Sequence, residues 1–103
     1  MKQSVIAQLR YDVQIAEKHR SIAKCILFCW NQRKKTAKWK RDLSAMHASL
    51  IEYYGVTNGK REWASVIRKV RMKGIHLNRR YKHCAEAVKR AKGALSVARE
   101  FAS

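Results

Sequence analysis

Three cysteines and a histidine have the spacing closest to a metal site in this chain. Cys25 and Cys29 are four residues apart and would share one face of a helix, and His83 directly precedes Cys84. Thiolate and imidazole ligands of this kind hold zinc in a tetrahedral site. Strong zinc signals pair two short ligand spacings, however, and this chain has nothing so compact. Because cysteine also packs as a small hydrophobe, the sequence favours core packing of the thiols and predicts no metal and no cofactor.

Acidic residues are too few and too scattered to suggest hydrolysis assisted by metal ions. That chemistry needs clustered carboxylates, and there is no glycine-rich phosphate loop either. The histidines form no obvious nucleophile–base pair with a cysteine, so the sequence predicts no enzyme. A metal-free phosphodiesterase that uses histidine and lysine is the alternative left open. The acids stand singly and the histidines are isolated: Asp12, Glu17, Asp42, Glu52, Glu62, Glu86 and Glu100, and His19, His47, His76 and His83.

Positive charge is the most distinctive property of the chain. Its 103 residues hold 24 lysines and arginines against seven acids, a formal net charge of +17. The cations concentrate in three clusters, at 33–41, 60–73 and 79–92, and only Asp42, Glu62 and Glu86 lie in or beside them. Pairs four residues apart on a helix therefore cannot neutralise the clusters. Since a domain with this surplus repels itself, we expect a polyanionic partner.

Nucleic acid is the polyanion that these clusters fit best. Contacts with phosphate need density and reach rather than a motif, and release of counterions from DNA or structured RNA would drive the binding. Trp39 lies among the cations of the first cluster, where packing in a helix seam is favoured over stacking on a base. The residues predicted to contact nucleic acid are Arg33, Lys34, Lys35, Lys38, Lys40, Arg41, Lys60, Arg61, Arg68, Lys69, Arg71, Lys73, Arg79, Arg80 and Lys82.

Two classes of function stay open. The first is a small nucleic-acid-binding protein, an accessory subunit of a larger nucleic-acid-processing protein. The alternative is a protein-interaction module, of the modulator type found in phages and plasmids, that docks on an acidic surface of such an enzyme. A homo-oligomer would strengthen either through avidity.

One short segment resembles a known DNA-binding motif. Leu50–Asn58 is similar to the first helix and turn of a helix-turn-helix, with apolar residues before Gly55 and Val56-Thr57 after it. The similarity covers about twenty residues. It departs where Arg61 replaces a core aliphatic and where Gly59 falls inside the second helix. A recognition helix that reads the major groove is therefore not favoured.

Composition indicates one helical domain over residues 1–103. Hydrophobic residues make up 47% of the chain, and no proline and only four glycines interrupt it, which favours long helices. An odd number of cysteines indicates reduced thiols in the cytoplasm. The stretch 22–30 is interrupted by Lys24 and is shorter than the roughly 20 residues that span a bilayer, so no membrane association is expected.

Apolar spacing predicts a small antiparallel bundle of about four helices, at approximately 3–30, 33–54, 60–73 and 76–101. We expect Gly55 to close the second helix, Thr57 or Asn58 to cap the third, and Gly74 to end it. A bend near residues 18–21 would interrupt the first helix. The inward positions are Val5, Leu9, Val13, Ala16, Ala23, Leu27 and Trp30, widened by Ile6, Ile22 and Ile26; then Trp39, Leu43, Met46, Leu50 and Tyr53; then Trp63, Val66, Ile67 and Val70; and finally Leu77, Tyr81, Cys84, Val88, Ala91, Leu95 and Ala98.

Overall fold

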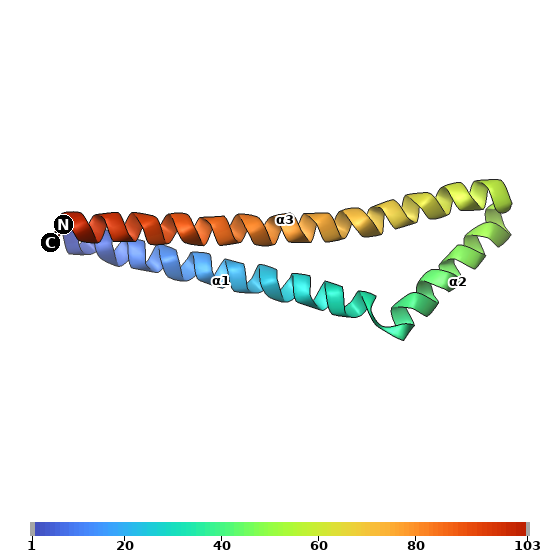
Figure 1. The fold of residues 1–103 in the computed structure, drawn as a ribbon, viewed down its shortest axis with the longest axis horizontal. Coiled ribbons are helices and arrows are strands. Elements are labelled where there is room, and N and C mark those ends of the chain that lie inside the picture. Colours follow the sequence, from blue (N-terminus) through green and yellow to red (C-terminus); the bar gives the residue numbers. More distant parts are fainter. Residues whose placement is uncertain (1, 103) are drawn as a thin grey trace. The chain divides into compact units, whose positions relative to one another are not determined.

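The computed structural model describes residues 2–102, which form three α-helices (Figure 1). These are α1 (Lys2–Lys34), α2 (Ala37–Tyr54) and α3 (Val56–Ala102). Within that range only Lys35, Thr36 and Gly55 lie outside a helix, and there is no strand. The prediction of an all-α protein is therefore confirmed, whereas the number of helices is three rather than about four.

The chain divides into two compact units. Unit 1 comprises Met1–Ile26 and Leu77–Ser103, and it pairs the first part of α1 with the last part of α3 in antiparallel orientation (Figure 1). Unit 2 comprises Leu27–His76, which includes the end of α1, all of α2 and the first part of α3. The prediction of a single domain over residues 1–103 stays a prediction.

The core of unit 1 follows the heptad seam of α3. Val88 is 1% exposed, and Leu95 and the facing helix's Ala23 are also buried. Every other seam position that the sequence predicted from Leu77 to Ala98 is half-buried. Periodicity therefore gave the correct register for this part of α3.

The broad apolar stripe predicted for α1 is only partly covered. Ala23 is buried, but Val5, which was predicted to face inward, is 55% exposed. Of the three residues that widened the stripe, Ile6 is half-buried, whereas Ile22 and Ile26 are exposed. A pair of helices buries one seam on each partner, so most of a broader stripe stays outside it.

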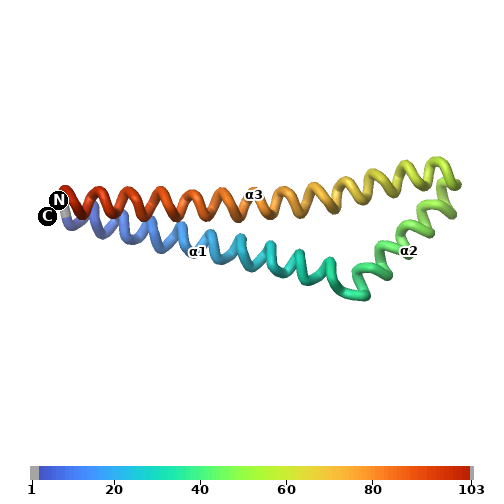
Figure 2. Tube along the Cα trace, in the orientation of Figure 1, coloured from blue at the N-terminus to red at the C-terminus, as the bar shows by residue number. Residues whose placement is uncertain are grey.

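The bend considered near residues 18–21 is absent, because α1 runs without a break through this stretch (Figure 2). Arg20, which interrupts the apolar spacing, is half-buried rather than fully buried. A long arginine side chain can lay its aliphatic stem along an apolar surface and keep its charge in water. The helix can therefore continue past it.

A two-residue connection joins α1 to α2. The Thr36 Oγ1 accepts a hydrogen bond of 3.2 Å from the Trp39 N–H and donates one of 2.8 Å to the Arg33 carbonyl. The first bond is an N-cap, which satisfies one of the free N–H groups at the start of α2. Thr36 therefore fixes where α2 begins.

The connection from α2 to α3 is the single residue Gly55. Its φ is +83°, and its N–H donates to the Ile51 carbonyl at 2.9 Å, so the prediction that Gly55 closes α2 is confirmed. Thr57 and Asn58 lie inside α3 and are not its cap, because α3 already begins at Val56. A helix-turn-helix uses a turn of three or four residues, so the earlier resemblance does not extend to the connection.

Two glycines that the sequence assigned to chain breaks lie inside α3 instead. Gly59 is buried, and a Cβ there would lie 2.7 Å from the Ile51 Cα, so its role is close approach of the two helices. A Cβ at Gly74 would lie 3.4 Å from the Trp30 Nε1, so this position packs against an indole. The predicted helix end at Gly74 and the predicted loop before residue 60 are both wrong.

The inner face of α2 also differs in part from its prediction. Trp39, Leu43 and Leu50 are half-buried as expected, whereas Met46 and Tyr53 are exposed. His47 takes an inner position because its ring lies against that of Trp63, with 4.8 Å between the centroids. The prediction missed this because a histidine does not register as an apolar seam residue.

Candidate nucleic-acid interface

Two tryptophans and two cations, contributed by all three helices, meet in unit 2. The rings of Trp30 (α1) and Trp39 (α2) form an edge-to-face pair with centroids 5.4 Å apart. The Arg33 Cζ lies 5.2 Å from the centroid of the Trp39 ring, and the Lys73 Nζ of α3 lies 4.7 Å from that of Trp30. We call these four residues the tryptophan corner. Each indole therefore carries one cation from the chain itself, in a cation–π contact.

The turn between α1 and α2 concentrates further cations beside the tryptophan corner. Lys34 and Lys35 end α1 and begin the turn, and Lys38 lies in the first turn of α2, which Thr36 caps. A small surface pocket of about 110 Å³ is lined by Arg33, Thr36, Lys38, Trp39 and Asp42. Asp42 is the acid nearest to this group in sequence. One carboxylate cannot balance the six cations of the 33–41 cluster.

All fifteen predicted contact residues are exposed in the structure. Twelve of them, from Arg33 to Lys73, are all the lysines and arginines of unit 2. Against them stand three acids, which leaves residues 27–76 with a net charge of +9. Cations held outward at this density present a strongly positive surface to any polyanion.

The structure brings together only part of the predicted set. Arg33 and Lys73, which are forty residues apart in sequence, meet at the tryptophan corner. Lys60 and Arg61 lie twelve or more residues from Lys73 along α3, which is about 18 Å at 1.5 Å per residue. Arg79, Arg80 and Lys82 belong to unit 1. The tryptophan corner therefore joins the first cluster to Lys73 of the second cluster.

Trp30 is the site residue whose role sequence reasoning missed. It was assigned to the core, and it is 7% exposed, but its ring also holds Lys73. Its buried Nε1 has no hydrogen-bond partner among the described residues. A usable signal was present, since Trp30 and Trp39 stand on either side of the run from Arg33 to Lys38. The prediction that Trp39 packs in a seam is confirmed by its contact with Trp30.

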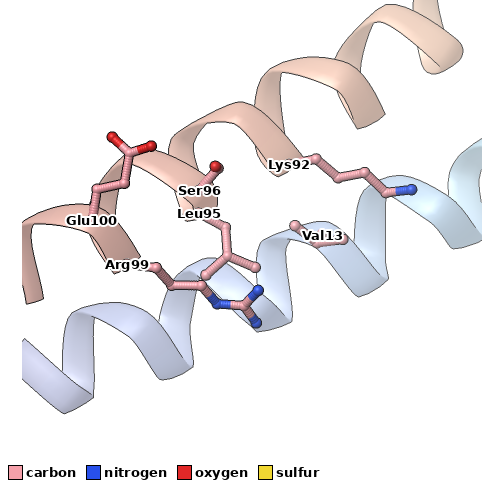
Figure 3. Close-up of a pocket in the computed structure, with 6 residues that line it drawn as sticks. All are labelled: Val13, Lys92, Leu95, Ser96, Arg99 and Glu100. Carbon is pink, nitrogen blue, oxygen red and sulfur yellow. The ribbon is translucent and has the colours of Figure 1, made fainter. Parts of the chain in front are cut away.

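The cations of unit 1 have different surroundings from those at the tryptophan corner. The Lys92 Nζ lies 3.4 Å from a Glu17 carboxylate oxygen, an exposed pair that contributes at most about 1 kcal/mol. Figure 3 shows Lys92 and Arg99 reaching from α3 toward α1 on either side of Leu95, while Glu100 points away. These residues line a surface pocket of about 580 Å³ together with Val13 and Ser96. Two of the cations of unit 1 thus flank its apolar seam.

The cysteines and histidines do not converge as a metal site. Among residues 2–102 there is no group of three histidine, cysteine or acidic side chains placed to hold an ion. Cys84 is half-buried in the seam of α3, but Cys25 and Cys29 are exposed, which corrects the expectation that they pack in the core. His19 and His83 line one pocket of about 340 Å³, a proximity that their separation in sequence concealed.

Comparison with known families, curated proteins and solved structures gave no match for this chain. In the described part of the chain, no helix combines the length and apolar character needed to cross a bilayer.

Proposed function

We propose that this protein binds the phosphate backbone of DNA or structured RNA through its exposed basic helices, with the tryptophan corner at the centre of the contact surface. The proposal includes a cytoplasmic accessory role in a nucleic-acid-processing complex. The observation that carries it is the convergence of Arg33 and Lys73 on two packed indoles, beside the cations of the α1–α2 turn.

Packing of the indoles supports this function in a specific way. Because Trp30 and Trp39 are held against each other, the cations on their rings are positioned by contact as well as by their own flexible stems. A cation fixed in this way loses less conformational freedom when it meets a phosphate. The cations stay exposed, so phosphate oxygens can reach them.

Charge also argues for backbone contact rather than for reading of bases. Exposed lysines and arginines distributed over three helices can follow phosphates of any sequence. Two residues join α1 to α2 and one residue joins α2 to α3, whereas a helix-turn-helix connects its recognition helix through three or four. We therefore expect similar affinity for unrelated sequences of the same nucleic-acid form.

The test is an equilibrium titration of the full chain with a fluorescent duplex DNA and a fluorescent RNA hairpin. Six phosphate contacts, one for each cation at 33–41, give a slope of log K against log salt concentration of about −5. Affinity should thus fall on the order of 1,000-fold between about 50 mM and about 200 mM salt. Absence of any salt-dependent complex would refute the proposal.

The alternative, docking on an acidic protein surface, gives a different result in a second measurement. Capture of a partner from lysate with and without nuclease treatment separates the two functions. If nucleic acid is the partner, nuclease releases the captured material. A stoichiometric protein that survives nuclease, together with a failed titration, would replace the proposal by the alternative.

A further inference from the structure

Unit 2 contains one segment without any positive charge. Residues 42–59 include Asp42 and Glu52 and no lysine or arginine, although the chain as a whole carries 24. This segment covers most of α2, the connection at Gly55 and the first residues of α3. This segment offers a polyanion no lysine or arginine, so its exposed side chains need a different explanation.

The exposed side chains of this segment form a groove on α2. We call it the tyrosine groove; its volume is about 710 Å³ and its lining is Met46, Ser49, Leu50, Glu52, Tyr53 and Tyr54. Tyr53 is 83% exposed, and Met46 and Tyr54 are each 46% exposed. The two tyrosine rings meet edge to face at 4.8 Å, beside the carboxylate of Glu52 in sequence. An apolar surface with aromatic rings and one carboxylate suits an apolar side chain accompanied by a cation.

The last part of α3 carries exposed apolar side chains accompanied by a cation. Arg90, Ala94, Val97 and Phe101 follow one another at intervals of four, three and four, so they share one helix face, and all are exposed. Val97 is 52% exposed and Phe101 is 80% exposed. Gly93 lies beside them with open space around it, which lets another helix approach closely. Arg90 is not among the residues predicted to bind nucleic acid.

We propose that the tyrosine groove of one copy of this chain receives the Arg90–Phe101 face of α3 from a second copy. The two helices run antiparallel, so that Val97 and Phe101 cover the Met46 side chain and the Arg90 guanidinium meets the Glu52 carboxylate beside the Tyr53 ring. The spacings agree, because Met46 and Glu52 are six residues apart and Val97 and Arg90 are seven, which is about 9 Å and about 10.5 Å along the two helices. The two surfaces differ, so the contact is head-to-tail and adds further copies.

Charge complementarity selects this occupant. The tyrosine groove holds the acid Glu52, and its occupant must bring a cation together with exposed apolar side chains. On α1, Lys24 is in line with one large exposed apolar residue, Phe28, and lies on a different face of the helix from Ile22 and Ile26. The Arg90–Phe101 face has its cation in line with two, Val97 and Phe101.

Repulsion between copies with a charge of +17 determines when this contact forms. The Debye length is about 10 Å at 0.1 M salt and about 3 Å at 1 M, so high salt removes the long-range repulsion. Apolar burial at the groove persists under those conditions. We therefore expect self-association without nucleic acid to increase with salt. This inference stands apart from the proposed function, because it needs no polynucleotide.

Sedimentation velocity of the full chain, free of nucleic acid, tests the inference. We expect a monomer at about 0.1 M salt and larger species at about 1 M. Tyr53→Ser and Phe101→Ser should each abolish these species, and both positions are exposed enough to leave the fold intact. Ile22→Ser is the matched control on another exposed apolar face and should change nothing.

A charge exchange identifies the partner surfaces. Glu52→Arg and Arg90→Glu should each weaken self-association about tenfold, the double variant should recover it, and a mixture of the two single variants should recover it as species in which the two variants alternate. Glu62→Arg and Lys89→Glu make the same charge changes at exposed positions elsewhere and should leave it unchanged. A monomer at every salt concentration, loss of association in Ile22→Ser alone, or a double variant no better than the singles would overturn the inference.

Discussion

The tryptophan corner and the tyrosine groove lie in the same unit and both are built on aromatic side chains, yet they have opposite surroundings. At the corner, Arg33 and Lys73 of the chain itself lie on the two indoles, which are packed against each other. At the groove, Tyr53 and Tyr54 contact only each other among the ring contacts described, and Glu52 is their charged neighbour. At the corner the aromatic rings hold cations of the chain, which stay exposed to a polyanion. At the groove the tyrosine rings hold no such cation, so they leave an apolar surface that a second copy can cover.

The largest expected difference between the two regions is in stability. Trp30→Ala removes the most buried side chain of the corner and should lower the free energy of unfolding by about 3–5 kcal/mol. Tyr53→Ala, at an 83% exposed position, should change it by less than about 0.5 kcal/mol. Denaturant unfolding followed by circular dichroism measures both. Equal losses in the two variants would show that the corner is not a packed structure.

The next effect separates the charges of the corner from the charge of the whole chain. The triple variant Lys34→Ala, Lys35→Ala and Lys38→Ala should weaken nucleic-acid binding on the order of 100-fold at about 0.1 M salt, because three phosphate contacts are lost. Lys18→Ala, Lys24→Ala and Lys89→Ala together remove the same charge at exposed positions outside the predicted set. Anisotropy titrations should show only a few-fold loss for this control. Similar losses in both triples would mean that net charge alone drives binding.

A smaller effect tests the close approach of α2 and α3 that presents the groove. Gly59→Ala places a Cβ 2.7 Å from the Ile51 Cα and should cost about 1–3 kcal/mol, since backbone atoms cannot move aside easily. Gly93→Ala meets no atom within 4 Å and should stabilise the protein by about 0.5–1 kcal/mol through helix propensity. Thermal unfolding of both variants checks the opposite signs. If Gly59→Ala left the stability unchanged, the close packing of α2 against the start of α3 would be contradicted.

The smallest expected effect concerns the turn that carries the cations of the corner. Thr36→Ala removes the hydrogen bond to the Trp39 N–H and should cost about 1 kcal/mol. Thr36→Ser keeps the hydroxyl and should retain most of that free energy. The comparison of the two variants by denaturant unfolding isolates the cap. If Thr36→Ser loses as much as Thr36→Ala, the hydroxyl is not what fixes the start of α2.

Sequence reasoning predicted the helical class and much of the seam, and its errors have identifiable physical causes. From Leu77 to Ala98 the spacing gave the correct inner face, because apolar residues recur there without interruption. Gly74 and Gly59 were assigned to breaks, but in this fold a glycine inside a helix also serves close packing. His47 replaced Met46 on the inner face of α2 because the ring of Trp63 provides a partner that spacing cannot reveal.

The candidate site was predicted as a set of residues but not as an arrangement. Charge density alone identified the fifteen exposed cations. The placement of Arg33 and Lys73 on one pair of packed indoles depends on how the helices pack within unit 2, and no local pattern encodes it. The tyrosine groove was missed because Met46 and Tyr53 fit the predicted seam, so they were assigned to the interior.

The most direct test of phosphate binding at the tryptophan corner is the salt dependence of the protein and of its Lys34, Lys35 and Lys38 triple variant on one duplex. We expect a slope of log K against log salt concentration of about −5 for the protein and about −2 to −3 for the variant, close to one unit lost for each lysine. Identical slopes, or no measurable complex for the unmodified protein at low salt, would contradict the proposed contact surface.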